Sequence, residues 1–225
     1  MRGCPFRVKQ EPMARFVLLF GAAALVLAAL AAPVSARDKG QGYYFDIGPD
    51  LNLLGDSELS SGAELAAESG LGAAIGTGYR FGSGLRAEFA LGMRRNNLDS
   101  VSAAVTFFGT PLAANAELNG DITTVYGLLN GYYDFDIGSN WAPYLGLGIG
   151  AASIELDSAA LGVDDTDTVP AWQGTLGLTY RISDNVWARG GYRYFGAADP
   201  EIAGTEFEIQ SHVLDIGLQI GFSAF

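Results

Sequence analysis

The segment from Leu71 to Met93 alternates strictly between large apolar residues and a second set of glycine, alanine, arginine and glutamate. Strict alternation predicts β-strands, and the connection Gly82-Ser83-Gly84 between two such runs predicts a hairpin. The large apolar residues form one continuous face, whereas Arg80, Arg86 and Glu88 fall on the opposite face beside glycines. This distribution suits strands that have lipid on one side and a narrow polar interior on the other. The hairpin therefore predicts a β-structure that spans a membrane.

The first 36 residues have the composition of a secretory signal peptide. Basic residues precede an apolar run at 16–32, and the small residues that end at Ala36 provide a cleavage site. An uncleaved membrane helix is the alternative, because the apolar run is nearly long enough to span a bilayer. We expect cleavage after Ala36, which leaves residues 37–225 as one β-barrel domain.

The chain beyond this leader is acidic and lacks cysteine. Of the 13 basic and 25 acidic residues, the leader holds four and one respectively, so residues 37–225 carry a formal charge of −15. Nucleic acid is therefore not an expected partner, because it requires a basic surface. Cys4 lies within the leader, so disulfides and thiol chemistry are not expected in the mature domain.

Eight candidate strands follow, and their connections alternate between short and long. The short connections lie at 82–84, 136–140 and 182–185, and the long ones at 55–70, 96–121, 155–169 and 196–210. Short turns at one end and long loops at the other are typical of bacterial outer-membrane barrels. A soluble barrel is the alternative, but it would leave most large apolar residues facing water. We expect an all-β, eight-stranded antiparallel up-and-down transmembrane β-barrel, with strands at 42–54, 71–81, 85–95, 122–135, 141–154, 170–181, 186–195 and 211–222.

Aromatic residues gather beside the short turns on the apolar face. A ring with a polar tip suits the boundary between membrane and water, so these residues are expected to form a periplasmic aromatic girdle. The last strand reaches Phe222 on the same face, and a terminal strand that ends in an aromatic residue resembles the signal read by the outer-membrane barrel assembly machinery. Phe225 has the opposite parity, so Phe222 is expected to end the barrel. The predicted girdle contains Tyr79, Phe81, Tyr133, Phe135, Trp141 and Tyr180.

Five short blocks occur in order along the chain, at the spacing expected of barrel strands. They are GYRFGSGLRAE at 78–88, NGYYDF at 130–135, PYLGLGIG at 143–150, AWQ at 171–173 and GYRYF at 191–195. Together the blocks resemble the OmpA-like, opacity-type family of small outer-membrane β-barrels, a group of surface antigens and porin-family proteins. The resemblance implies an eight-stranded barrel exposed on the surface of a Gram-negative bacterium.

Strand parity places charged side chains in the barrel interior. Either they line a narrow porin-like pore for small solutes, or they fill the lumen with mutually satisfied hydrogen bonds. Eight strands enclose a space just wide enough for side chains, whereas aqueous channels need about 16, which favours the filled lumen. Inward glycines are expected to leave room for arginines, and Arg80 and Arg86 are expected to lie within reach of Glu88. The predicted interior charge network contains Arg80, Arg86, Glu88, Arg94, Asp134, Arg181, Arg189, Arg193 and Asp215.

The sequence offers no arrangement of residues typical of catalysis. His212 is the only histidine and follows Ser211, but neighbours on a strand point to opposite faces. A lipid A-modifying barrel enzyme is therefore the weaker alternative. One histidine and no mature cysteine also argue against a metal site, and no cofactor is expected.

Recognition is expected to reside in the long loops. These loops are acidic, and the second contains Phe107 and Phe108. As hypotheses, the acids share divalent cations with lipopolysaccharide phosphates and the Phe pair contacts a partner. The alternatives are a solvated acidic fringe and a loop that packs on itself. We expect a structural, surface-exposed protein that contacts outer-membrane lipid and lipopolysaccharide, with loops available for adhesion or host contact.

Overall fold

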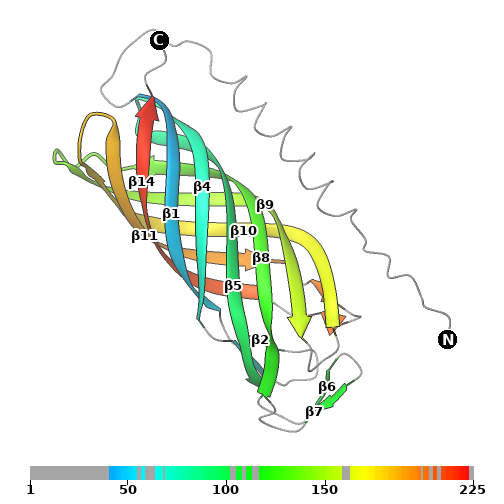
Figure 1. Cartoon of the computed structure of the whole chain (residues 1–225). Helices are drawn as coiled ribbons and strands as arrows, with labels where there is room; N and C mark the ends of the chain where they lie inside the picture. The colour runs from blue at the N-terminus through cyan, green and yellow to red at the C-terminus, as the bar shows by residue number, and fades with distance from the viewer. Residues whose placement is uncertain are drawn as a thin grey trace. The chain divides into compact units, whose positions relative to one another are not determined.

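The computed structural model describes residues 41–54, 57–58, 64–67, 69–101, 105–107, 110–112, 117–158, 163–198, 200–202, 205–206 and 209–222. All the regular structure within these ranges is β-strand (Figure 1). No helix long and apolar enough to cross a membrane occurs among them. The predicted leader at 1–36 lies outside the described residues.

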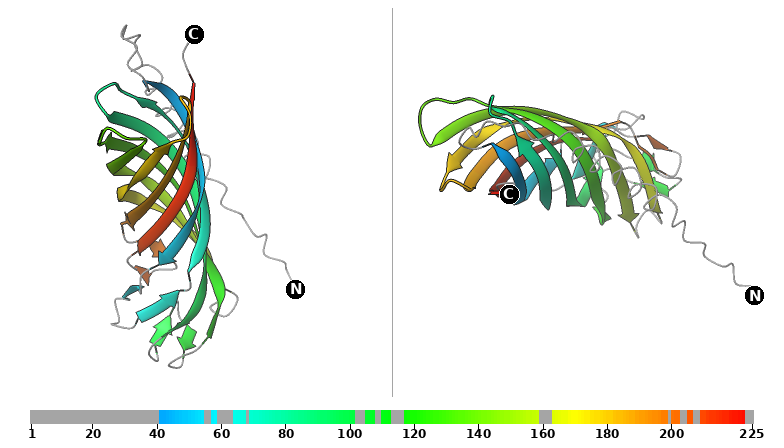
Figure 2. Two further views of the ribbon diagram at one scale, coloured as in Figure 1. Left: turned by 90° about the vertical axis from the view of Figure 1, so that its left-hand side faces the viewer. Right: turned by 90° about the horizontal axis from the view of Figure 1, so that it is seen from above.

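Eight long strands form a closed antiparallel barrel (Figure 1), which confirms the predicted fold class. Each strand pairs with the next around the barrel, and the last pairs back to the first. Figure 2 shows these strands curving around a common interior. The strands are β1 (Gly42–Leu54), β4 (Gly70–Arg80), β5 (Leu85–Val101), β8 (Glu117–Asp134), β9 (Trp141–Ser158), β10 (Val163–Arg181), β11 (Val186–Ala197) and β14 (Ile209–Phe222).

Six short strands lie within the long connections. The pair β2 (Ser57–Glu58) and β3 (Glu64–Ala67) continues the barrel wall, because β3 also pairs with β5. The pair β6 (Val105–Phe107) and β7 (Thr110–Leu112) forms a separate hairpin in the second loop. The pair β12 (Glu201–Ile202) and β13 (Thr205–Glu206) forms another in the fourth. Phe107 is therefore the last residue of β6 and pairs with Thr110, whereas Phe108 lies outside the described residues.

At the end of the barrel that carries the short connections, here called the turn end, the strand bounds agree with the prediction to within one residue. The register of the first hairpin is also confirmed, because Gly78 pairs with Glu88. The turns that follow β4 and β8 contain Gly84 and Gly138, at φ of 85° and 70°. A residue with a Cβ rarely adopts this left-handed conformation, so glycine makes these tight connections accessible.

At the opposite end, here called the loop end, the predicted long connections at 96–121 and 155–169 are too long. β5 continues to Val101, and β9 and β10 together leave only residues 159–162 between them. Pairing continues because the alternation of large and small residues continues there. Ile122 of β8, for example, pairs with Leu156 of β9.

The register of the cross-strand pairs shifts in the same direction around the whole barrel. Following them once around from Tyr44 ends at Leu54, ten residues farther along β1. A stagger of this kind accompanies the tilt that strands need to close a barrel. Residues that pair directly therefore lie at different heights along the barrel axis. As a result, strand order alone does not reveal which side chains meet across the lumen.

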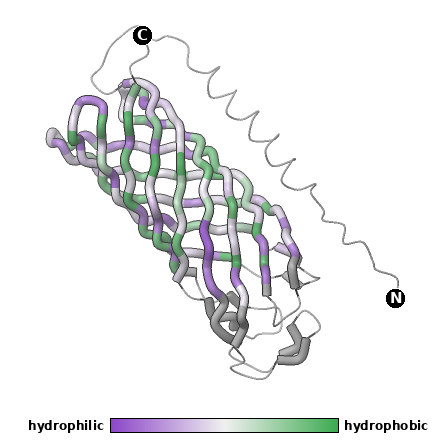
Figure 3. The backbone as a smooth tube through the Cα atoms, in the orientation of Figure 1, coloured by the Kyte–Doolittle hydropathy of each residue, from purple (hydrophilic) through white to green (hydrophobic). Residues whose placement is uncertain are grey.

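The outward face of the wall changes chemistry along β5, β8, β9 and β10. On β9, Leu147 and Ile149 are 76% and 71% exposed, as expected of side chains in contact with lipid. Farther along the same face, Glu155 and Asp157 are exposed instead. We call the polar part of the wall the outer extension: residues 95–97 of β5, 120–123 of β8, 153–157 of β9 and 165–169 of β10. Figure 3 shows the alternation along the strands and the hydrophilic stretch of β5.

The inward face changes in the opposite sense. Near the turn end the lumen is filled with charged and hydroxyl-bearing side chains, whereas toward the loop end buried apolar side chains fill it together with neutral polar ones such as Asn52 and Ser211. The Tyr126 and Phe195 rings meet across the lumen, with centroids 5.5 Å apart. The wall is thus a membrane barrel in its lower part and resembles a water-soluble barrel in its upper part. The apolar set, here called the outer core, contains Ile122, Ile154, Leu156, Val169, Phe195, Ile209 and Val213.

Candidate functional site

The polar lumen begins at the turn end with an ion pair between β5 and β8. Arg86 donates through Nε and Nη2 to the two carboxylate oxygens of Asp134, at 2.7 and 3.0 Å. Arg80 of β4 approaches the same carboxylate at 3.5 Å and donates to Gln219 Oε1 at 2.9 Å. The Arg80 guanidinium also lies 4.5 Å from the Trp187 ring centroid. These contacts connect five strands at the turn end: β4, β5, β8, β11 and β14.

Glu88 has different partners from those predicted. Tyr44 donates to its Oε2 at 2.9 Å, and Tyr132 donates to its Oε1 at 3.2 Å. Arg80 and Arg86, which were expected to lie within reach of Glu88, both pair with Asp134. The turn-end cluster comprises these side chains: Tyr44, Arg80, Arg86, Glu88, Tyr132, Asp134 and Gln219.

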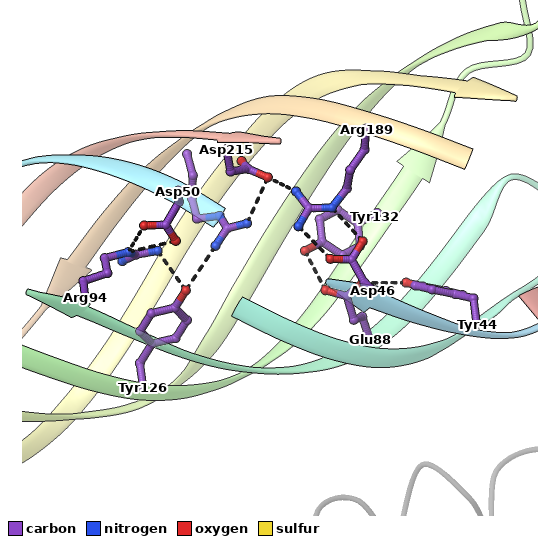
Figure 4. A network of polar contacts seen from close by, with 10 residues as sticks. Tyr44, Asp46, Asp50, Glu88, Arg94, Tyr126, Tyr132, Arg189 and Asp215 are labelled. Atoms are coloured by element: carbon purple, nitrogen blue, oxygen red, sulfur yellow. Dashed lines mark hydrogen bonds and ion pairs between the residues drawn. The ribbon is translucent and has the colours of Figure 1, made fainter. Parts of the chain in front are cut away.

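A second group of charges lies farther along the lumen (Figure 4). Arg189 donates to both carboxylate oxygens of Asp46 at 2.6 Å and also pairs with Asp215. Arg193 Nη2 lies 3.6 Å from the same Asp215 carboxylate. These contacts link β1, β11 and β14, so they depend on closure of the barrel.

Tyr126 extends this group toward the outer core. Its hydroxyl accepts hydrogen bonds from Arg94 at 3.0 Å and from Arg193 at 3.4 Å. Arg94 Nε in turn lies 3.3 Å from Asp50 Oδ1. Asp50 was not among the predicted site residues, although it shares its face with Asp46. The central cluster comprises these side chains: Asp46, Asp50, Arg94, Tyr126, Arg189, Arg193 and Asp215.

The two clusters balance in formal charge, with five arginines against four aspartates and Glu88. Buried charges require such pairing, because desolvation of an unpaired ion costs several kcal/mol.

Arg181 departs from the prediction that it belongs to the interior charge network. Its inward parity brings it only to the exposed rim at the turn end, and no ion pair to it occurs among the described residues. The strand ends before the lumen can enclose it, so Arg181 lies outside both clusters.

Tyrosine side chains occupy the space that inward glycines leave. A Cβ at Gly92 would collide with the Tyr126 ring, and one at Gly146 would collide with the Tyr132 ring. Tyr144 lies against Gly177 in the same way. Sequence reasoning expected arginines beside the inward glycines, which holds for Arg94 at Gly72 and Arg189 at Gly217, but it missed the tyrosines. Strand parity alone identifies them, since Tyr132 lies two residues from Asp134 on the same strand.

The predicted girdle residues lie on the outward face at the turn end. Tyr79 packs edge-on against Phe81, Tyr133 packs against Phe135, and the Trp141 ring meets Tyr180 with centroids 4.6 Å apart. Their exposed, paired rings are suited to an interfacial belt. Phe222 is outward as well, pairs with Tyr43 and is the last residue of β14. Residues 223–225 lie outside the described residues.

The outer core closes the lumen toward the loop end. Phe195 and Val213 are almost fully buried there, and the polar side chains beside them, such as Asn52 bonded to Asn96 at 2.7 Å, are buried as well. A constriction lined by apolar groups excludes water and ions. The geometry therefore favours a filled lumen over a pore.

We expect no steady conductance from the refolded protein in planar bilayers. The Glu88→Ala variant should behave in the same way, because the outer core lies beyond Glu88 and remains in place. Single-channel recording tests both proteins under identical salt and voltage. A steady conductance that Glu88→Ala alters would reveal an open path through the lumen.

Among the described residues, no group of three histidine, cysteine, aspartate or glutamate side chains is placed to hold a metal ion. His212 lies outward and Ser211 is buried inward, so the two point to opposite faces. The partner of His212 is Tyr192, whose Oη lies 2.6 Å from Nδ1.

Comparisons with known proteins support this architecture. Outer membrane protein PagN of Salmonella typhimurium is 27% identical over 113 residues, which cover 47% of this chain and 46% of PagN. The chain thus matches about half the length of that curated relative. Neisserial surface protein A superposes with a TM-score of 0.54 at 21% identity, covering 80% of this chain and 97% of that structure. For OprG of Pseudomonas aeruginosa the TM-score is 0.52 at 16% identity, covering 81% and 97%.

The two solved structures share the fold of this chain, as small barrels of the outer membrane. The family model described as outer membrane protein beta-barrel domain matches residues 22–222, which include every strand of the barrel. The chain belongs to this family of outer-membrane β-barrel proteins.

Proposed function

We propose that this outer-membrane protein acts through its exposed loop-end face, as a structural surface protein that contacts host or surface ligands. The observation that carries the proposal is the reversal of polarity along the wall. Strands β5, β8, β9 and β10 continue beyond the apolar band with polar side chains outward, while the buried apolar side chains of this region come from three of them: Ile122 of β8, Ile154 and Leu156 of β9, and Val169 of β10. This arrangement holds a rigid polar surface above the membrane, where loops carry recognition.

The outer extension supplies charged groups for such contacts. Glu155 and Asp157 are exposed on β9, and Arg95 of β5 donates to Asp121 of β8 at 2.8 Å. The surface is therefore acidic but not uniformly so. A ligand with a basic contact region is the complementary partner, since opposite potentials steer association.

Lipid and assembly contacts follow from the same geometry. We propose that the apolar band contacts lipid and that Trp172, Tyr194 and His212 meet lipopolysaccharide at its outer boundary. Their rings stack at centroid separations of 5.3 and 5.4 Å. We also propose that Phe222 is recognised by the outer-membrane barrel assembly machinery, because it ends the last strand on the outward face.

We further propose that the protein is not an enzyme. The outward His212 is bonded to the Tyr192 hydroxyl, and no carboxylate among the described residues bonds to it. General-base chemistry at the lipid face would need such a partner to orient and charge the imidazole. Turnover of labelled lipid A that His212→Ala abolishes would contradict this proposal.

Removing charge from the outer extension should weaken ligand binding. The double variant Glu155→Gln, Asp157→Asn is expected to reduce binding of the nanodisc-embedded barrel to collagen or laminin about two- to thirtyfold, because two exposed ion pairs at roughly 0.2–1 kcal/mol each are lost. The matched control, Asp136→Asn with Asp184→Asn, removes two acids from the short turns and should leave binding unchanged. Surface plasmon resonance measures both. An equal loss in both variants would argue for a nonspecific charge effect.

A further inference from the structure

A cavity of about 10 Å³ lies between the two polar clusters of the lumen. The turn-end cluster contributes Glu88 and Gln219 to its lining, and the central cluster contributes Arg189 and Arg193. Thr175 of β10, which belongs to neither cluster, also lines the cavity. About 10–15 Å³ of this kind of space is enough to hold one water molecule.

The two clusters have no direct bond to each other. Within the described residues, the hydrogen bonds of Glu88 go to Tyr44 and Tyr132, both in the turn-end cluster. Those of Arg189 and Arg193 go to side chains of the central cluster. The cavity is therefore the place where the two clusters face each other without contact.

Three polar atoms on the cavity lining lack a partner among the described residues. They are Thr175 Oγ1, Arg193 Nε and Gln219 Nε2, and the three side chains are 6%, 4% and 1% exposed. Each of these groups can donate a hydrogen bond. A buried donor without an acceptor costs about 1–3 kcal/mol, so three around one cavity require an acceptor inside it.

We propose that this cavity binds one ordered water molecule, which accepts from Arg193 Nε and Gln219 Nε2, donates to Thr175 Oγ1, and so joins the turn-end and central clusters. The size of the cavity suits water, and two to four polar partners are what a buried water requires. A halide would also accept from the donors. It would, however, add a charge to a lumen whose arginines and carboxylates already balance, next to Glu88.

Magnetisation transfer from water in the refolded, isotope-labelled barrel tests the proposal. The side-chain amide protons of Gln219 should show cross-relaxation with water. The sign and rate of this cross-relaxation should be those of a water molecule that stays in the cavity for longer than nanoseconds. Thr175→Val keeps the shape of the side chain and removes one partner, so the cross-peak should weaken about twofold or more. Thr175→Leu also fills the space and should abolish it.

Thr179→Val is the matched control. Thr179 lies on the same face of β10, is 2% exposed, and its hydroxyl also lacks a partner among the described residues, but it does not line the cavity. This variant should leave the cross-peak intact. No cross-peak in the wild type, or equal loss in both valine variants, would overturn the proposal. Replacing chloride with gluconate provides the remaining check, since a Thr175-dependent change in the Gln219 resonances would assign the cavity to a halide.

Discussion

Replacing Leu147 with arginine should destabilise the folded barrel by about 2–4 kcal/mol. Leu147 is 76% exposed on the outward face of β9, in the middle of the apolar band, so the new charge would face hydrocarbon. Equilibrium unfolding by urea in lipid vesicles, followed by tryptophan fluorescence, measures the loss. The large expected effect arises although the position looks like an ordinary surface site.

Glu155→Arg is the control for this prediction. Glu155 lies on the same face of the same strand, beyond the reversal of polarity. The same side chain introduced there should change stability by no more than about 1 kcal/mol, the value found near the membrane interface. Comparable losses at both positions would place Leu147 and Glu155 in the same environment and remove the basis for the outer extension.

Arg189→Met should destabilise the barrel by about 3–5 kcal/mol, through a different mechanism. Arg189 is the bidentate partner of Asp46 and also pairs with Asp215. Its removal leaves the Asp46 carboxylate buried with no cation, whereas Asp215 retains Arg193 at 3.6 Å. The same unfolding assay measures the effect.

Two further variants separate this loss from a general packing defect. Adding Asp46→Asn to Arg189→Met should restore much of the stability, because the unpaired buried charge is then gone. Arg181→Met makes the same substitution at the exposed rim, and its effect should stay within about 0.5 kcal/mol. If the asparagine gives no recovery, the methylene stem of Arg189 rather than its charge supports the barrel.

The part of the fold that sequence predicts best is the part with the strongest local pattern. Alternation, short turns and flanking aromatic residues all lie near the turn end, and the strand ends there agree closely with expectation. Toward the loop end the alternation persists but reverses its chemistry, so that Ile154 faces inward and Glu155 outward. A rule that assigns every polar run to a loop fails at such a reversal.

Partners within the lumen could not be predicted in the same way. Parity fixes the face on which a side chain lies, whereas its height depends on the stagger of all eight strands. Arg189 and Asp46 are 143 residues apart in the sequence and meet only because β14 closes against β1. Local spacing instead suggested Glu88 as the partner of Arg86, and the structure selects Asp134.

The reversal of polarity also fixes how deeply the barrel sits in its membrane. Sinking by one or two residues would carry Glu155 into hydrocarbon, and rising by as much would expose Leu71 to water. Many membrane segments tolerate a thicker or thinner bilayer by tilting. A closed barrel with a charged upper wall has no such freedom. It should therefore fold best in lipids within one narrow range of chain length. In lipids outside that range, the bilayer rather than the barrel should distort.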